Sequence, residues 1–423
     1  MANRSASEMR RRNRSSVMLE VLKHGAISRT QIASEIGITG AAVTRITREL
    51  IERGILEESD QSSINGNVGR RQTQLTLSGG GPYVIGFAIQ AAERLIVLAN
   101  LSGEILSEVK IPLGIIKNIG RRASDLPALI DYMLDKVGIG IDEVLGIGVA
   151  VAGAVDPSQN FVSRSPPLGW TNVPIGKLLS DQFNLPVAVE NLNNALSISE
   201  HTFGLGQGMR NIMIFRMSYR VGGGFIVEEN IVRGDGFGAG QFGHAPVTGA
   251  DGLCSCGNRG CLNTVASGLA VLSEVQGKEY HVVADGDVVE NTRDMLEMLE
   301  RSERGDTKIQ EVLFGAGRKF AATLNTVSII FRPELVLLAG QMGRNRYFVD
   351  GVRHALSKDL RTETLSLEKI EISKMSVAQA AIYLALLRFV YSGSFDINSI
   401  KRIDDATTEH LNPNAPALVE RYG

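Results

Sequence analysis

The stretch at residues 240–267, GQFGHAPVTGADGLCSCGNRGCLNTVAS, contains all three cysteines of the chain and a histidine ahead of them. These four side chains have the spacing H-x9-C-x-C-x4-C in a glycine-rich segment: His244, Cys254, Cys256 and Cys261. Zinc prefers thiolate and imidazole ligands in a tetrahedron, and four protein ligands leave no open position for catalysis. The segment therefore predicts a structural Zn²⁺ site; the alternative is three free thiols beside a histidine packed in the core.

The composition of the whole chain excludes several classes of protein. Its 423 residues exceed one ordinary domain, because domains of about 100–200 residues would give two to four of them. An apolar fraction of 43% and a charged fraction of 21% are typical of a globular chain. No apolar run is long enough for a membrane span, and no apolar segment follows the N-terminal arginines as in a secretory signal. With too few cysteines for a disulfide framework, these features favour a cytoplasmic protein.

The charge is distributed unevenly between the N-terminus and the rest of the chain. Residues 1–75 hold 12 Lys and Arg against 8 Asp and Glu, a net of +4, whereas the remainder has a net of −6. Five arginines lie within residues 1–14, with one acid, Glu8. A basic end on an acidic body indicates binding to nucleic acid or another anionic surface. For the arginine-rich arm alone, a disordered solubilising tail is the alternative.

Three helices are expected in the first part of the chain. Residues 15–24 carry apolar side chains at helical spacing. Ser28 and Gln31 form a capping-box pattern for a second helix, and Thr39 is a suitable N-cap for a third helix that runs to Arg53. This succession of short helices predicts a helix-turn-helix.

The third helix and a following hairpin carry the candidate DNA contacts. On that helix the outward-facing candidates for base or phosphate contacts are Thr44, Arg45 and Arg48, because arginine can donate two bonds to guanine in the major groove. Residues 55–77 read as two strands around a polar loop, the wing of a winged helix, and Arg70 and Arg71 in that loop are candidates for a minor groove. The expected partner is a double-stranded DNA operator; the alternative is a three-helix bundle with a solvated charged face.

From Tyr83 onward the sequence predicts an α/β body. Buried strands are expected at 83–90, 94–101, 144–153 and 185–191, and a strand–turn–strand pattern recurs at 211–232. The repeated pattern indicates two related lobes. The predicted limits are 1–79 for a winged helix-turn-helix domain with its basic arm, 80–195 plus 376–395 for a first α/β lobe, 196–375 for a second α/β lobe with the zinc site, and 396–423 for a C-terminal tail.

Three sequence motifs resemble, in their order along the chain, those of the ROK family of repressors, open reading frames and sugar kinases. They are the cysteine segment, SPPLGW followed by LPVAVEN (165–170 and 185–191), and PELVLLAG at 333–340. The resemblance covers about residues 14–392, and the winged helix marks the transcription-factor branch. It implies two ribonuclease-H-like lobes of the actin and sugar-kinase type with a sugar in the cleft. It also implies zinc next to that sugar and assembly as a homodimer or homotetramer.

The chain departs from the family's kinase motifs at three places. Where family kinases have the acidic residue and a glycine of D-x-G-G-T, this chain has Ala88 and Gln90. The second phosphate loop, normally G-T-G-x-G, contains the bulky Tyr219 and Arg220, although backbone amides need small residues to approach a phosphate. The aspartate that acts as catalytic base is replaced by Leu192, which cannot accept a proton. The sequence therefore predicts that the protein is not an enzyme.

The family's sugar-contacting positions are altered as well. Pro167 and Leu192 replace polar residues. The remaining polar candidates for an effector site are Asn191, Gln241, His244 and Asn263. A site built for particular hydroxyls rejects a ligand that lacks them, so we expect a sugar-like effector other than glucose or N-acetylglucosamine. Less hydroxylated, acidic and phosphorylated compounds are the candidates. An empty site with purely structural hydrogen bonds is the alternative.

The sequence as a whole favours a DNA-binding transcriptional regulator, most often a repressor, of carbohydrate-related genes with a small effector in the interlobe cleft. One alternative is a ligand-independent DNA-binding scaffold controlled by a protein partner. A less favoured one is an active sugar kinase with an added DNA-binding domain.

Overall fold

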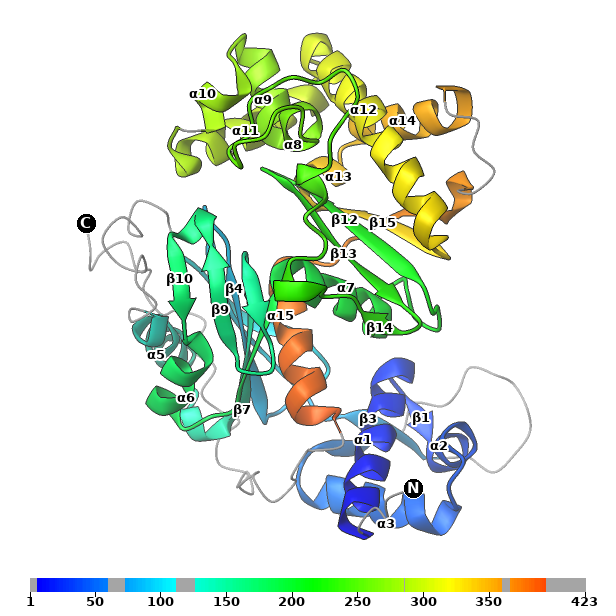
Figure 1. Cartoon of the computed structure of the whole chain (residues 1–423). Helices are drawn as coiled ribbons and strands as arrows, with labels where there is room; N and C mark the ends of the chain where they lie inside the picture. Colours follow the sequence, from blue (N-terminus) through cyan, green and yellow to red (C-terminus); the bar gives the residue numbers. More distant parts are fainter. Residues whose placement is uncertain (1–5, 60–72, 112–125, 285, 360–365, 393–423) are drawn as a thin grey trace.

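The computed structural model describes residues 6–59, 73–111, 126–284, 286–359 and 366–392. Two five-stranded sheets with surrounding helices form the body, and a smaller group of helices and short strands contains the N-terminal residues (Figure 1). No helix in these ranges is long and apolar enough to cross a membrane. The limits between the parts that the sequence suggested stay predictions.

The N-terminal part contains three helices and a three-stranded sheet. Its elements are α1 (Ala6–His24), β1 (Ile27–Ser28), α2 (Arg29–Ile36), α3 (Gly40–Glu52), β2 (Leu56–Ser59) and β3 (Gln74–Leu77), with the strand order β1-β3-β2. Both expected caps form, since the Ser28 side chain and Gln31 make a capping box and Thr39 Oγ1 accepts from Ala42 N. The tip of the wing, with Arg70 and Arg71, lies outside the described residues.

The first helix begins earlier than the sequence analysis expected. We predicted a helix over 15–24 after a basic arm, but α1 starts at Ala6, so most of that arm is helical. Arg14 differs most from the expectation, because its side chain is only 11% exposed and its Nη2 lies 2.9 Å and 3.0 Å from the two carboxylate oxygens of Glu49. Arg14 thus joins α1 to α3 and is not available as a free arm residue.

The first lobe is built on a five-stranded mixed sheet. Its strands, in spatial order, are β11 (Val187–Asn191), β7 (Val144–Val151), β4 (Tyr83–Ile89), β5 (Arg94–Ala99) and β6 (Ile105–Ile111). Because strand side chains alternate between faces, Ile85 and Phe87 pack with α5 (Leu126–Val137) and α6 (Ile175–Phe183), whereas Val84 and Ala88 pack with α15 (Val377–Ala385).

The second lobe repeats this topology. Its sheet order is β14 (Asn230–Ile231), β13 (Val221–Val227), β12 (Ile212–Met217), β15 (Leu335–Ala339) and β16 (Ile370–Ile372). In chain order, the first three strands of each sheet pair antiparallel with one another in succession, and the last two strands run parallel to the first. The repeat that the sequence suggested is therefore present as two sheets of the same topology.

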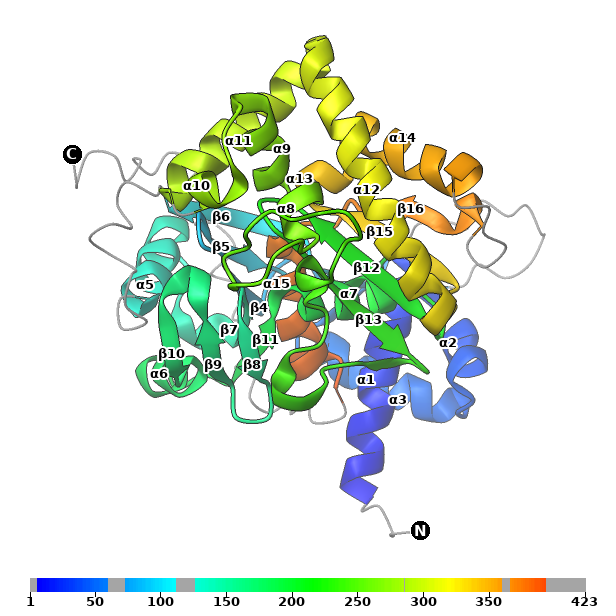
Figure 2. The same cartoon turned by 45° about the horizontal axis from the view of Figure 1, so that its top comes forward.

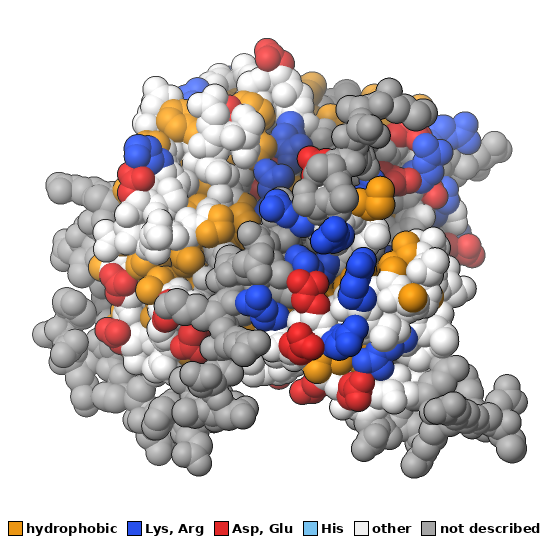
Figure 3. Space-filling view, turned by 90° about the horizontal axis from the view of Figure 1, so that it is seen from below, with side chains coloured by type: hydrophobic (Ala, Val, Ile, Leu, Met, Phe, Trp, Pro, Cys, Tyr) orange, Lys and Arg blue, Asp and Glu red, His pale blue; other side chains and the backbone are white. Residues whose placement is uncertain are grey.

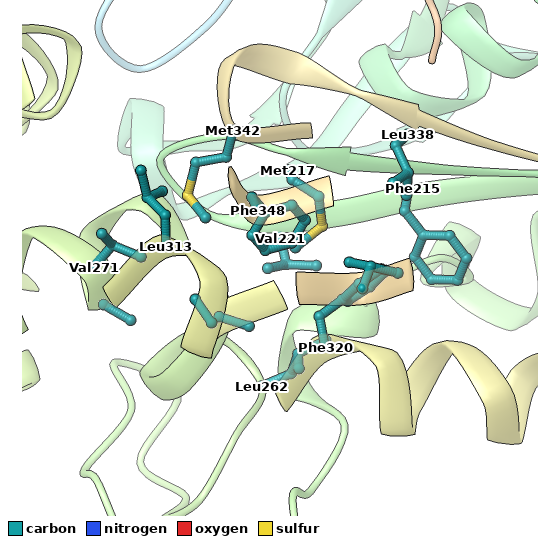
Figure 4. Packing of buried hydrophobic residues seen from close by; sticks show 14 of the residues in the cluster. Phe215, Met217, Val221, Leu262, Val271, Leu313, Phe320, Leu338, Met342 and Phe348 are labelled. Atoms are coloured by element: carbon teal, nitrogen blue, oxygen red, sulfur yellow. The ribbon is translucent and has the colours of Figure 1, made fainter. Parts of the chain in front are cut away.

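One face of the second sheet is covered by helices. These are α8 (Asn263–Ala266), α9 (Gly268–Gln276), α10 (Tyr280–Ala284), α11 (Val288–Glu303), α12 (Thr307–Phe331), α13 (Gly340–Gly343) and α14 (Arg346–His354). Figure 2 shows α12 crossing in front of β12 with α14 beside it. Phe215 of β12 meets Phe320 of α12 edge to face with ring centroids 5.2 Å apart, and Phe320 in turn meets Phe348 of α14 (Figure 4).

Two helices, α7 (Leu192–Phe203) and α15, lie between the sheets and pack against each other. Glycines in the strands let them approach closely. A Cβ on Gly148 would lie 2.2 Å from the carbonyl oxygen of Ala381 in α15, and one on Gly224 would lie 2.5 Å from Ser197 Oγ in α7. The apolar strand VLGIGVAVAG therefore contains glycine where a helix has to lie directly on the sheet.

A small antiparallel sheet extends the first lobe next to the cleft. It consists of β8 (Ala154–Asp156), β9 (Phe161–Ser165) and β10 (Trp170–Val173), and its β8 contacts the short turn Asp235–Phe237 of the second lobe. Further short turns complete the chain: Ile141–Glu143, Pro166–Leu168, Phe242–His244, Ala355–Asp359, Leu367–Lys369 and Leu386–Val390.

Candidate functional site

The helix α3 presents its polar face to solvent. Val43, Ile46 and Leu50 are buried beneath it. The three candidate DNA-contacting side chains on this helix are exposed: Thr44, Arg45 and Arg48. The orientation expected from the helical spacing is confirmed for α3, and contact with DNA stays a prediction.

The position of α3 is fixed by a polar clamp around Arg29. The Arg29 Nε donates to Thr47 Oγ1 in α3 over 3.0 Å, and its Nη2 lies 2.7 Å from Glu58 Oε1 in β2. One guanidinium thus ties α2 to both α3 and the wing. Seen from below, Lys and Arg side chains gather in a band on the side of the molecule where the N-terminal helices lie, with Asp and Glu between them (Figure 3).

The four predicted zinc ligands meet in space. Ligand atoms of His244, Cys254, Cys256 and Cys261 all lie within 4.8 Å of one another. Cys254 Sγ is 3.7 Å from His244 Nδ1, and Cys256 Sγ is 3.7 Å from Cys261 Sγ. Zinc–sulfur bonds of about 2.3 Å at tetrahedral angles place two sulfurs about 3.8 Å apart. The arrangement therefore brings the four ligand atoms close to the spacing of a tetrahedral metal site.

The backbone around the cysteines forms a tight knuckle. Cys254 N donates to the carbonyl oxygen of Asn258 over 2.8 Å, which closes the turn between the cysteines. Gly260 has φ +72°, and a Cβ there would lie 2.4 Å from the Ala250 carbonyl oxygen, so this position requires glycine. Burial lowers the pKa of His244, with a further contribution from Arg220. Histidine is therefore neutral near pH 7, the form that binds a metal.

The predicted effector residues have different surroundings. Asn191 caps α7, where its Oδ1 accepts from two backbone amides and its Nδ2 donates to the Gly153 carbonyl oxygen over 2.6 Å. Asn263 is 2% exposed and its Oδ1 accepts from Val221 N over 2.8 Å. Gln241 is exposed. Two of the four side chains are thus engaged in structural hydrogen bonds, whereas Gln241 and one nitrogen of His244 have capacity for a ligand.

The sequence analysis missed a buried ion pair between the lobes. Glu190, 1% exposed at the end of β11, lies 2.6 Å from Arg233 Nη2 in the segment after β14. Its other oxygen accepts from Asn191 N and from Asn194 Nδ2. The signal was present in the sequence, since Glu190 is the only charged residue in the otherwise apolar LPVAVEN.

A cavity of about 680 Å³ lies between the lobes at the positions that resemble phosphate loops. Its lining includes Gln90, Tyr219 and Arg220, together with Arg216 of β12 and side chains of α11. Gln90 Oε1 accepts a hydrogen bond from Arg216 Nη2, so the two lobes touch at the cavity wall. None of the four predicted effector residues is in this lining. The cavity is therefore separate from the four predicted effector residues.

The residues at the altered catalytic positions are buried or line the cavity. Ala88 is fully buried and Leu192 is 1% exposed. Neither side chain can hold a metal ion or accept a proton. The described geometry thus provides no carboxylate at these two positions.

Comparison with known proteins identifies related sequences for both parts of the chain. A family model described as ROK family matches residues 90–386, and one described as winged helix-turn-helix DNA-binding matches residues 10–57. The xylose repressor of Caldicellulosiruptor bescii is 27% identical over 386 residues, which cover 90% of this chain and 95% of that protein. The DNA-binding transcriptional dual regulator NagC of Escherichia coli K12 is 28% identical over 335 residues, covering 78% and 80%.

Solved structures share the fold. The structure of a ROK family transcriptional regulator, a homolog of the E. coli MLC protein, covers 91% of this chain and 98% of its own at 23% identity, with a TM-score of 0.68. A ROK family glucokinase from Streptomyces griseus, in complex with glucose and AMPPNP, covers 71% and 98% at 24% identity, with a TM-score of 0.58. These matches confirm the predicted fold class, a winged helix-turn-helix followed by two lobes of the sugar-kinase type.

Proposed function

The chain belongs to the ROK family, and from this premise we propose that it is a DNA-binding transcriptional regulator, of the repressor type, for carbohydrate-related genes. One observation carries the proposal: a winged helix-turn-helix with an exposed, arginine-bearing third helix precedes a complete two-lobed ROK body. Several relatives of this chain are named repressors.

The proposed DNA contacts come from α3 and the wing. Arg45 and Arg48 would bond guanine edges or phosphates in the major groove, and Thr44 would bond a phosphate. Arg70 and Arg71 of the wing would enter the neighbouring minor groove. The clamp of Arg29 on both α3 and β2 supports this proposal, because it holds helix and wing in one rigid unit.

We propose that the body does not transfer phosphate. Phosphoryl transfer needs a metal-binding acid, small residues around the phosphates and a group that positions or deprotonates the attacking hydroxyl. Ala88 supplies no carboxylate for a metal ion, and Leu192 supplies none for the attacking hydroxyl. The large side chains of Tyr219 and Arg220 occupy the second loop. The fold is that of kinases, and the proposed use is binding alone.

The proposed effector is sugar-like and binds beside the cysteine knuckle. Gln241 and the nitrogen of His244 that does not face the cysteines would bond its hydroxyls. Asn191 and Asn263 would shape the same site through the backbone groups that they hold. The Glu190–Arg233 ion pair adjoins Asn191 and crosses between the lobes, so a ligand here could favour one lobe arrangement over another.

We propose a structural Zn²⁺ held by His244, Cys254, Cys256 and Cys261. Four protein ligands would leave it no position for a reactant, so it would supply a cross-link within the loop 244–261. Arg220 Nη1 donates to Ser255 Oγ over 2.5 Å, which connects this loop to the turn before β13.

A continuous apolar core supports transmission from the cleft to the DNA-binding part. Val17, Leu50 and Leu75 of the N-terminal part belong to the same cluster as Val84 of β4 and Ile382 of α15. In addition, Ser15 Oγ of α1 donates a hydrogen bond to the Ser392 carbonyl oxygen over 2.5 Å. A change in lobe closure would therefore move the winged helix as one body with the first lobe. Assembly as a homodimer or homotetramer would place two such helices on an operator.

The proposal is tested by selecting operator duplexes from a random library with the purified protein. Binding to the selected duplex is then titrated with sugars, polyols and sugar phosphates. We expect a specific duplex and at least one compound that changes its affinity. Failure to select any duplex contradicts a regulator, and ATP turnover with hexoses supports the kinase alternative. A selected duplex that no metabolite affects supports the scaffold controlled by a protein partner.

A further inference from the structure

The cavity at the former phosphate loops has predominantly apolar walls. Ala91 and Ala92 stand where the resemblance places a glycine and a threonine, and they extend the apolar surface of the turn after β4. Opposite parts of the lining come from α11, with Val288, Val289 and Leu296. Leu296 in this lining is 38% exposed. A cavity with this lining favours the apolar body of a small organic molecule.

The polar end of the cavity carries an excess of positive charge. Arg216 donates to Gln90, a neutral partner. Among the described residues no carboxylate oxygen lies within 4.0 Å of the Arg216 or Arg220 guanidinium. The neighbouring acid Glu93 is already engaged, 2.5 Å from Lys110 Nζ. Burial lowers the pKa of Arg216 to about 10, while Glu93 opposes and Arg344 adds to this effect. A partly buried cation with no carboxylate in direct ion-pair contact favours an anionic ligand group.

The anion is not a nucleotide polyphosphate. Ala88 provides no carboxylate for the magnesium ion that accompanies ATP, and Gln90 occupies the place of a phosphate-loop glycine with its amide bonded to Arg216. Tyr219 is half-buried at the second loop, where a phosphate would need bare backbone amides. Guanidinium groups beside an apolar wall match a single carboxylate, which accepts hydrogen bonds in the guanidinium plane.

We propose that this cavity is a second ligand site that binds an amphipathic monocarboxylate, with its carboxylate at Arg216 and Arg220 and its apolar body along Ala92 and α11. The acids of α11 in the lining, Glu297 and Glu300, would repel the head group and so fix this direction. The site is distinct from the sugar-like effector site at Gln241 and His244, and its occupation does not depend on DNA binding.

The test measures binding of octanoate to the purified full chain by calorimetry and by thermal shift. The comparison ligands are measured in the same way. Acetate has the carboxylate without the alkyl chain, 1-octanol has the alkyl chain without the charge, and Mg-ATP represents the nucleotide. We expect octanoate to bind at least about tenfold more tightly than acetate or 1-octanol, because both the charge-assisted bonds and the apolar contacts contribute. Equal binding of all three, or no binding of octanoate, overturns the proposal.

Two variants locate the site. Ala92→Phe adds a large side chain to the cavity wall and leaves the cations in place, and we expect it to weaken octanoate binding at least about tenfold. Arg216→Met removes the charge and should reduce the preference for octanoate over 1-octanol by a similar factor. Matched controls on the second lobe surface are Ala322→Phe and Arg353→Met, both at exposed positions. If Arg216→Met does not fold, Ala92→Phe alone decides.

Three outcomes overturn the site. They are unchanged octanoate binding in Ala92→Phe, an equal loss in Ala322→Phe, and Mg-ATP binding that competes with octanoate and is lost in Ala92→Phe. The last result would identify a retained nucleotide site.

Discussion

The side-chain oxygen of Gln90 accepts a hydrogen bond from the guanidinium of Arg216, and this contact joins the end of β4 to β12 across the interlobe cavity. We expected a phosphate-loop glycine of family kinases at the position of Gln90, and in this chain the Gln90 side chain connects the two lobes. Its Nε2 also donates to Glu93 over 3.1 Å, which fixes the amide orientation. The altered motif thus has a structural role of its own.

Replacing Gln90 by alanine should destabilise the protein. The change leaves the desolvated Arg216 cation without its side-chain acceptor, and an unsatisfied buried polar group costs about 1–3 kcal/mol. We expect a loss in that range in the free energy of unfolding, measured by urea titration. Gln207→Ala, at an exposed position on the second lobe side of α7, is the control and should change it by less than about 0.5 kcal/mol. Equal stability of both variants would remove the interlobe role from Gln90.

Arg45→Ala and Arg48→Ala should each weaken binding to a selected operator duplex. Loss of a bidentate guanine contact costs about 1–3 kcal/mol, whereas loss of a phosphate contact mainly reduces the salt dependence by about one counter-ion. Fluorescence anisotropy over a KCl series separates these two roles. Arg353→Ala in α14 also removes one positive charge, but far from α3 in the sequence, and this control should bind the duplex as the wild type does. Unaltered affinity in both α3 variants is incompatible with α3 as the recognition helix.

Local sequence signals predicted the parts of the fold that local chemistry determines. The capping pattern of Ser28 and Gln31 forms as expected, because a side-chain acceptor three residues from a partner is a local arrangement. The cysteine spacing predicted a cluster whose ligand atoms lie together. The strand repeat predicted two lobes, since alternating buried strands carry their own pattern.

Long-range contacts could not be predicted in the same way. Arg14 looked like part of a basic arm, and only the packing of α1 on α3 brings it to Glu49, 35 positions away. The pairing of Glu190 with Arg233 likewise depends on the meeting of two lobes. Asn191, which stays a predicted effector residue, also caps α7 as the residue before that helix, and the sequence analysis did not foresee this role. A side chain's partners follow from the tertiary arrangement, which residue type alone does not specify.

The stability of α12 should depend on pH through Asp306. Its hydrogen bond from Arg301 and bonds from the helix amides lower the pKa of Asp306 below its ordinary value of 3.8. A lowered folded-state pKa stabilises the protein above the ordinary value, and this contribution disappears as pH falls through the lowered one.

Asp306→Asn keeps a capping oxygen but removes the charge, so the difference from wild type in unfolding free energy should be largest at about pH 7 and should shrink as pH falls below the ordinary value of 3.8. Urea titrations across this range measure it. Asp350→Asn on the exposed face of α14 should show no such trend; a difference from wild type that is constant with pH would contradict the role of the Asp306 charge.

Removing the proposed zinc should destabilise the second lobe. A metal present at about 1,000 times its dissociation constant stabilises the folded state by about 4 kcal/mol, which corresponds to a melting temperature shift of roughly 10 °C in a domain of this size. We expect about one zinc per purified chain by plasma mass spectrometry, a lower melting temperature after chelation, and loss of the metal in Cys256→Ser. Thr248→Ala lies in the same loop at an exposed position and should keep its zinc. Retention of zinc and normal melting in Cys256→Ser would refute the four-ligand site, whereas loss of zinc with unchanged melting would limit the metal to a role other than stabilising the fold.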